Sequence, residues 1–237
     1  MLKRIFLTSL MFVIISSFAF SQSVDDIVNS MNKSRGGAEA YAKIQNWKMS
    51  GTTSMMGQSI AFTQYFKKPN MFRSEQEIMG SKIIQTFDGN QGWMINPMTG
   101  SNDVQQMDSA SVEQLKRTND IFEGPVNNYK EKGIKIDLLG KEDAAGVNCY
   151  KMKIINKKSE STLWVNTETY LPVKMKSTVN QMGNNMEVET NFLDYKDFQA
   201  IKMPTRVVMN AMGMEISMLF EKIELNTAID DTIFKKP

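Results

Sequence analysis

The sequence predicts a mainly β protein with a few helices, folded as a half-open antiparallel β-barrel of about ten or eleven strands with a helical lid. Three observations support this fold class. From Trp47 onward, apolar and polar residues alternate with a period of two. Turn residues interrupt the alternation about every 8–12 residues, and the strands do not alternate with helices as they do in parallel sheets. Because a sheet of this size twists and curls, one face becomes concave, and we expect the helices to cover that face.

Residues 1–21 have the pattern of a secretory signal peptide. A basic start is followed by an apolar run from Ile5 to Phe20 and by small residues before a cleavage site after Ser21. The apolar run contains several hydroxyl residues and is shorter than the ~20 residues that a membrane span needs, which favours cleavage over anchoring. We therefore expect export to the periplasm as residues 22–237, which form one domain because no linker divides them.

Two stretches of the chain are predicted to be helical. Residues 24–46 carry apolar residues at three- and four-residue spacing, and Gly36-Gly37 divides them into two helices. A second stretch starts at a capping residue, Asp108 or Ser109, and runs to about Ile121. Both stretches, 24–46 and 108–122, are expected to act as lids.

The strands fall into two groups on either side of the second helical stretch. The first group lies between Trp47 and Ile95 and the second between Ile134 and Phe220. In both groups one set of alternating positions is apolar and the other carries Lys, Glu, Thr or Asn, which is typical of an antiparallel sheet with one buried face.

The composition excludes most catalytic chemistry. The 237-residue chain has no histidine and one cysteine, so it has no Ser-His-Asp or Cys-His nucleophile and no histidine-ligated zinc. Cys149 has no basic neighbour in register, so its thiol is predicted to be buried or idle. We expect no enzymatic activity, no catalytic residues, no cofactor and no metal site.

The charge balance argues against two classes of partner. Loss of residues 1–21 lowers the Lys and Arg total from 28 to 26, which equals the 26 Asp and Glu residues. A chain with zero net charge has no field that attracts nucleic acid or anionic membranes, so neither is expected as a partner. We expect a monomer.

Methionine is the unusual component of the sequence. The chain has 20 methionines, and 18 remain without Met1 and Met11. Methionine fits surfaces whose partner varies in shape, so these side chains indicate either an adaptable apolar cavity or a methionine-rich core. Met-Gly pairs occur at four predicted hairpin turns. These are 56–57, 79–80, 182–183 and 212–213.

Successive turns of an antiparallel sheet alternate between its two ends. The first two Met-Gly turns therefore share one end of the sheet, and the last two Met-Gly turns also share one end. Whether those ends coincide depends on the strands across 108–125, and the sequence leaves this open. A rim of mobile thioethers would suit the mouth of a lipid-binding cleft, although glycine is common in turns in any case. A rival use of methionine is Cu(I) binding by Met209, Met212 and Met214, whose soft thioether ligands suit that ion.

Three segments of the sequence carry a family resemblance. Residues 66–73 read FKKPNMFR, residues 87–97 read FDGNQGWMINP, and Met203-Pro204 precedes a closing IDDTIFKKP at residues 229–237. In order and spacing these segments resemble the LolA/LolB-like periplasmic outer-membrane lipoprotein carriers. One departure is Lys68, where LolA carriers commonly have arginine. Lysine lacks the forked contacts of arginine, which affects any handover role of this position.

The resemblance implies an unclosed β-barrel with helices over an apolar cavity that holds the acyl chains of lipoproteins. It also implies handover partners at the inner and outer membranes. Together with the alternation, it predicts a periplasmic carrier of lipoprotein or other lipid acyl chains in the lipoprotein-sorting class. Nine apolar side chains are predicted to line the cavity. They are Phe62, Phe66, Phe72, Phe87, Trp93, Met175, Met209, Met218 and Phe220.

Two alternatives remain at this point. The first is a non-catalytic envelope interaction module, in which the same barrel is filled by its own side chains. The second is the methionine-based Cu(I)-binding protein described above.

Overall fold

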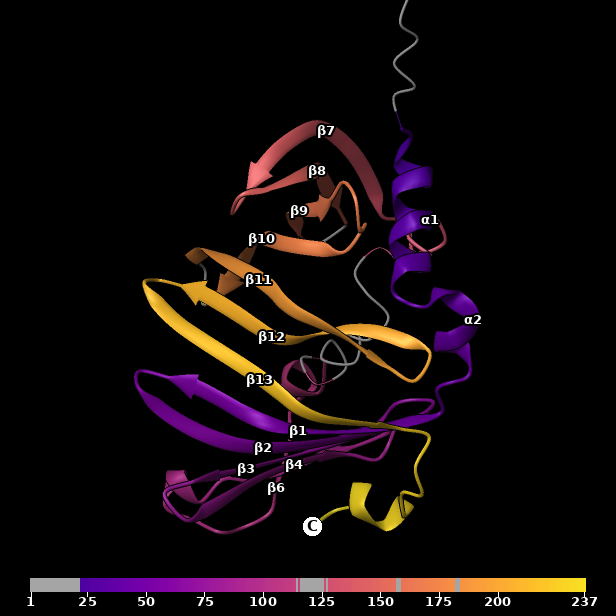
Figure 1. Cartoon of the computed structure of the whole chain (residues 1–237). Coiled ribbons are helices and arrows are strands. Elements are labelled where there is room, and N and C mark those ends of the chain that lie inside the picture. The colour runs from indigo at the N-terminus through magenta and orange to yellow at the C-terminus, as the bar shows by residue number, and fades with distance from the viewer. Residues whose placement is uncertain (1–21, 114, 116–125, 127, 157–158, 182–183) are drawn as a thin grey trace, which may run out of the picture.

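Thirteen β-strands form one antiparallel sheet in the computed structural model, which describes residues 22–113, 115, 126, 128–156, 159–181 and 184–237. The strand order is β6-β5-β4-β3-β2-β1-β13-β12-β11-β10-β9-β8-β7, so the two edge strands do not pair and the barrel stays open (Figure 1). This confirms the predicted fold class. The strand number exceeds the expected ten or eleven because a two-residue strand such as β6 is too short to show alternation.

The strands of the sheet have the following bounds: β1 Asn46–Met55, β2 Gln58–Lys67, β3 Met71–Ile78, β4 Ser81–Phe87, β5 Gly92–Ile95, β6 Gln105–Gln106, β7 Lys135–Ala144, β8 Val147–Ile155, β9 Glu160–Asn166, β10 Pro172–Gln181, β11 Asn184–Phe198, β12 Ile201–Ala211 and β13 Met214–Leu225. The helices are α1 Val24–Ser34 and α2 Gly37–Ala42, with short 3₁₀ turns η1 Pro97–Thr99 and η2 Asp231–Phe234.

Pairing between β1 and β13 joins two strand groups that are far apart in sequence, β1–β6 and β7–β13. The register shifts at Ser50 and Gly51, where the two backbones approach closely. A Cβ atom at Gly51 would lie 1.9 Å from the carbonyl oxygen of Leu219. Only glycine fits this position without moving one of the strands.

The first helix begins with a capping box in which Ser23 and Asp26 bond each other's backbone N–H groups. Its buried side, Ile27, Val28 and Met31, belongs to an apolar cluster with strands β7–β9.

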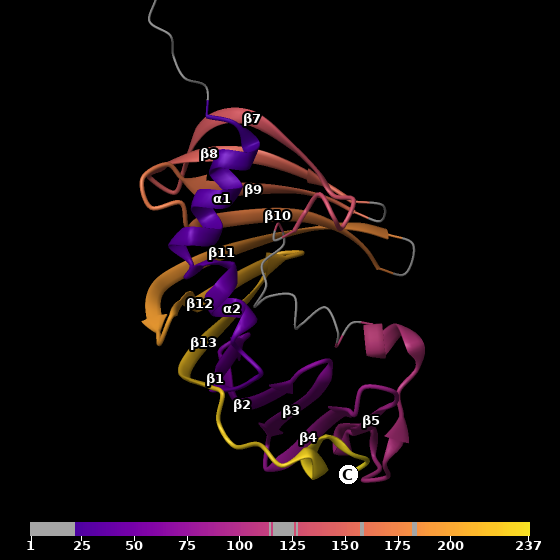
Figure 2. The ribbon, with the colours of Figure 1, turned by 90° about the vertical axis from the view of Figure 1, so that its right-hand side faces the viewer.

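Gly36 separates α1 from α2, because its φ of 119° is left-handed and a Cβ there would lie 2.2 Å from a backbone oxygen. Figure 2 shows both helices lying across the strands at one side of the sheet. The helices predicted within 24–46 are thereby confirmed.

The second predicted helical stretch is described only at its start. Residues 109–113 and 115 are helical, and residues 114 and 116–122 lie outside the described residues, as do the predicted signal peptide and one Met-Gly pair. Among the described residues, no helix is long and apolar enough to cross a bilayer. Division of the chain into a signal peptide and one exported domain stays a prediction.

Two apolar clusters lie against the concave face, one over each half of the sheet. The first combines strands β1–β4, β12 and β13 with Val112 and Leu115 from the second helical stretch. The second combines strands β7–β9 with α1. A smaller third cluster of Ala144, Cys149 and Trp164 lies on the convex face. Burial raises the pKa of the Cys149 thiol, which agrees with an idle side chain.

Candidate functional site

The strand registers place one row of apolar side chains after another along the concave face of β1–β4, β12 and β13. Directly paired residues in antiparallel strands share a face. Phe62 and Phe220 are both paired with Gly51, and their rings meet edge to face at 5.7 Å. Phe66 lies opposite Trp47 on one side and Phe72 on the other, and its ring stacks on Trp47 at 5.6 Å. These rows form the floor of the candidate site.

Burial along these strands decreases steadily toward one end of the sheet. In β1, Trp47 and Met49 are at most 4% exposed, whereas Met55 at the far end of the same face is 37% exposed. In β13, Phe220 is buried, Ile216 is half-buried and Met214 is 46% exposed. The concave face is therefore closed at one end and accessible at the other.

Three of the four Met-Gly pairs lie at this accessible end, which we call the methionine rim, and the fourth lies outside the described residues. The β1–β2, β3–β4 and β12–β13 turns contain Met56, Met79 and Met212 at their first central position. The register of β1 with β13 brings the β12–β13 turn beside the β1–β2 turn. Gln181 and Asn184, which flank the fourth pair, belong to the same end through β11 and β12. The two ends that the sequence left unplaced thus coincide.

The structure brings seven of the nine predicted cavity residues together. Phe62, Phe72, Phe87 and Phe220 are buried members of the first cluster, and Phe66, Met209 and Met218 pack against it while partly exposed. Met175 lies on the concave face but packs against the second cluster.

Trp93 does not join the other predicted residues. It pairs with Thr86 across β4 and β5, whereas Phe87, on the concave face, pairs with Gly92. Neighbouring residues of a strand point to opposite faces, so Trp93 is on the convex face. The convex face is itself covered nearby by η2, which contacts β3 and β4 and buries Phe234. Apolar residues therefore occur on both faces here.

Four isoleucines on the open part of the concave face were missed in the sequence analysis. Registers place Ile60, Ile78, Ile83 and Ile216 on that face, half-buried and close to the methionine rim. A cavity of about 250 Å³ at this end is lined by residues of β2, β3 and the turns that adjoin them. They are Gln58, Ser59, Ile60, Glu77, Ile78 and Met79. The period-two pattern of β2, β4 and β13 could have identified Ile60, Ile83 and Ile216.

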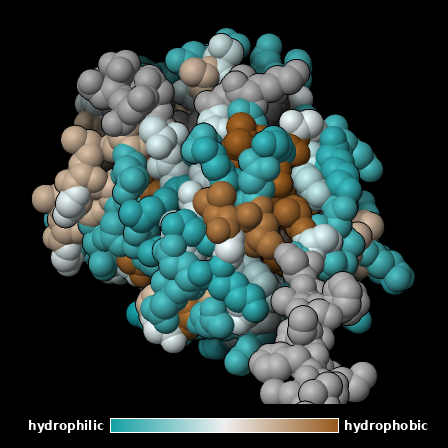
Figure 3. All heavy atoms as spheres, turned by 90° about the horizontal axis from the view of Figure 1, so that it is seen from above, coloured by the Kyte–Doolittle hydropathy of each residue, from teal (hydrophilic) through white to brown (hydrophobic). Residues whose placement is uncertain are grey.

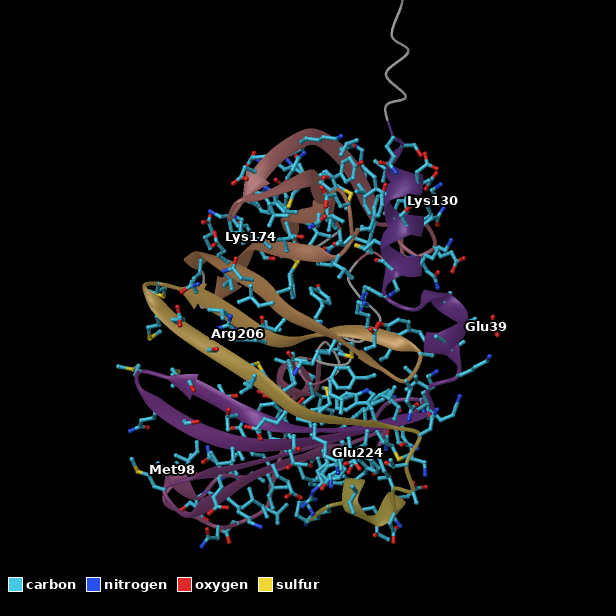
Figure 4. All side chains as sticks on the ribbon, in the orientation of Figure 1. Glu39, Met98, Lys130, Lys174, Arg206 and Glu224 are labelled. Atoms are coloured by element: carbon cyan, nitrogen blue, oxygen red, sulfur yellow. The ribbon has the colours of Figure 1, made fainter. Side chains whose placement is uncertain are left out.

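Charged groups are confined to the other face of these strands. Within the described strands β1–β4, β12 and β13, the concave positions given by the registers carry no Lys, Arg, Asp or Glu. Arg206 and Glu224, labelled in Figure 4, are paired with Leu219 and Lys48 on the convex face. Arg206 also forms an ion pair with Asp194. The concave face can therefore take up an apolar ligand without burying an unpaired charge.

At the closed end, the polar groups beside α2 are buried. The Arg35 guanidinium lies 5.2 Å from the ring centre of Tyr41, and burial raises the pKa of the Tyr41 hydroxyl. Burial also raises the pKa of Tyr195, whose hydroxyl donates to the carbonyl oxygen of Pro172 at 2.9 Å. A raised pKa keeps each of these hydroxyls protonated and neutral at physiological pH.

The three methionines of the copper hypothesis have different surroundings. Met209 is half-buried and packs against the first cluster, whereas Met212 is 79% exposed at a turn and Met214 is 46% exposed. No grouping of three or more His, Cys, Asp or Glu side chains suited to a metal occurs among the described residues. Copper binding by methionine stays an untested hypothesis.

The open antiparallel sheet with its helix-covered concave face is the LolA-like open-barrel fold, and three solved structures share it. A DUF1329 family protein from Desulfovibrio piger has 14% identity and a TM-score of 0.60, with 90% of this chain and 97% of that chain covered. A LolA superfamily protein from Nitrosomonas europaea has 14% identity, a TM-score of 0.57 and the same coverage. A domain from Vibrio parahaemolyticus, described as an outer membrane lipoprotein-sorting protein, has 13% identity and a TM-score of 0.56, with 89% and 95% covered.

At sequence identities this low, the structural likeness shows a shared fold alone. A family model described as an uncharacterized protein matches residues 67–237, and the chain belongs to that family. No curated protein matches the sequence.

Proposed function

We propose that this protein is a periplasmic carrier that holds the acyl chains of lipoproteins or other lipids against its concave face and performs no covalent chemistry. The observation that carries the proposal is the charge-free concave face of β1–β4, β12 and β13, which is closed at one end and open at the methionine rim. The lipoprotein-sorting description of a protein with the same fold supports this assignment.

Apolar burial alone is sufficient to hold such a ligand. Each methylene removed from water contributes about 0.8 kcal/mol, so a long acyl chain needs no specific polar contact. The half-buried side chains at the open end include Met209, Met218 and Ile216, and flexible thioethers adapt to chains of different shape. In this proposal, residues 1–21 are removed on export, α1 covers the other half of the sheet, and membrane-bound partners load and unload the lipid.

Binding of a fluorescent fatty acid, measured for variants at two adjacent residues, tests the proposal. Met218 is on the concave face opposite Thr53, and Leu219 is on the convex face opposite Arg206. We expect the delipidated exported chain to bind the probe, and Met218→Glu to weaken binding at least tenfold because a carboxylate would have to be desolvated beside the acyl chain. Leu219 is 41% exposed, so Leu219→Glu adds the same charge on the other face and should leave the affinity unchanged.

Circular dichroism of both variants checks that they fold. Absence of probe binding to the unsubstituted chain, or equal binding by the two variants, would contradict the proposal. The first result would favour an envelope interaction module whose barrel is filled by its own side chains.

A further inference from the structure

Exposed large apolar side chains are concentrated at the methionine rim. Among the described residues eight such side chains are exposed, and six are methionines at this end of the sheet. They are Met55, Met56, Met79, Met98, Met212 and Met214. Met98 belongs to η1, which follows β5 toward the rim, and Figure 4 labels it on that side of the molecule. The other two are leucines, Leu139 on β7 and Leu219 on the convex face of β13.

Three of these methionines occupy a backbone conformation that is unfavourable for them. Met56, Met79 and Met212 each have a φ of 51°, and the glycine that follows each has a φ of 75–77°. Positive φ at both central residues is the signature of a type I′ turn, in which asparagine or glycine is preferred at the first position. Each side chain is also 79–80% exposed. Neither backbone preference nor burial accounts for methionine at the same place in three turns.

The rim is also nearly uncharged. The segments 54–59, 77–82 and 210–215 contain three charged residues, which are Glu77, Lys82 and Glu215, and no cluster of one sign of charge. The convex wall behind the rim is different, because charged residues such as Lys176 and Glu187 pair there. In Figure 3 the left-hand margin, where the hairpin ends lie in Figure 1, shows a band of moderately hydrophobic residues.

We propose that the methionine rim docks on a phospholipid bilayer, with the thioether side chains inserted among the lipids and no requirement for anionic headgroups. Flexible, polarizable side chains suit the irregular boundary between headgroups and acyl chains. A surface without clustered basic residues has no electrostatic attraction to anionic lipids, so apolar insertion would supply the affinity. This orientation would place the open end of the concave face against the membrane.

Vesicle flotation with a triple variant tests this surface. The variant Met56→Asn, Met79→Asn and Met212→Asn removes the exposed thioethers and installs the residue that type I′ turns prefer, so its midpoint of thermal unfolding should equal or exceed that of the unsubstituted chain. We expect the exported chain to float with phosphatidylcholine vesicles, with little change when salt or anionic lipid is added. The triple variant should bind at least tenfold more weakly.

The matched control, Leu139→Ser with Leu219→Ser, removes exposed apolar side chains away from the rim and should retain vesicle binding. Failure of the unsubstituted chain to float, or equal binding by the triple variant, would overturn the proposal. So would self-association of the chain through the rim in place of vesicle binding, as measured by light scattering. Fatty-acid binding in solution should be unchanged in the double variant Met56→Asn with Met212→Asn, which keeps the cavity-lining Met79, so a failure of rim docking is distinguishable from a failure of the carrier proposal.

Discussion

Gly51→Ala should reduce the free energy of unfolding by about 3 kcal/mol or more, because it forces apart the two strands that join the N-terminal and C-terminal parts of the sheet. The new Cβ atom would lie 1.9 Å from the Leu219 carbonyl oxygen and 3.1 Å from the Phe220 Cα atom, and both belong to the backbone. A backbone atom cannot move aside as a flexible side chain can. For a chain of this size, the loss corresponds to a fall of about 10 °C in the midpoint of thermal unfolding.

Gly57→Ala is the matched control for this prediction. Gly57 lies in the β1–β2 turn, where a Cβ atom would have nothing within 4 Å, so the cost comes only from its φ of 77° and should be about 1 kcal/mol. Thermal unfolding followed by circular dichroism compares the two. Equal midpoints would show that β1 and β13 do not approach as closely at Gly51 as the structure has them.

Trp47→Ala should cost about 3–5 kcal/mol, the range for truncating a fully buried aromatic residue. Trp47 is 1% exposed and is surrounded by Phe66, stacked at 5.6 Å, and Phe72, edge-on at 6.4 Å. Truncation would leave a cavity in the floor of the concave face, because the paired strands on both sides fix the backbone. Trp93→Ala, on the convex face and partly exposed, should cost clearly less. Urea unfolding of the two variants gives the comparison, and equal losses would be inconsistent with a core centred on Trp47.

The fold was predictable because its signals are local and repeated. Period-two alternation and turn residues defined most strands, and apolar spacing defined the first helix. The pairing of β1 with β13 was not predictable in the same way, because it joins residues far apart in sequence. The glycine that permits this close approach is not distinguishable in the sequence from other strand glycines.

The candidate site was predictable where one face of a strand is clearly apolar. Phe62 and Phe220 alternate with polar residues, and both lie on the concave face. Trp93 lies in a four-residue strand with apolar residues on both faces, so alternation there does not show which face is concave. Whether the Met-Gly turns share one end of the sheet depends on how the strands before residue 108 pair with those after residue 125. That pairing is a property of the whole sheet, and no local sequence pattern indicates it.

Native mass spectrometry of the chain purified from cells, without delipidation, tests the carrier claim most directly. A lipid held between the concave strands should appear as an added mass equal to one or more acyl-chain compounds, should be displaced by excess fatty acid, and should be reduced in Met218→Glu but retained in Leu219→Glu. A spectrum with the bare mass of the polypeptide, unchanged after incubation with lipid, would contradict the account.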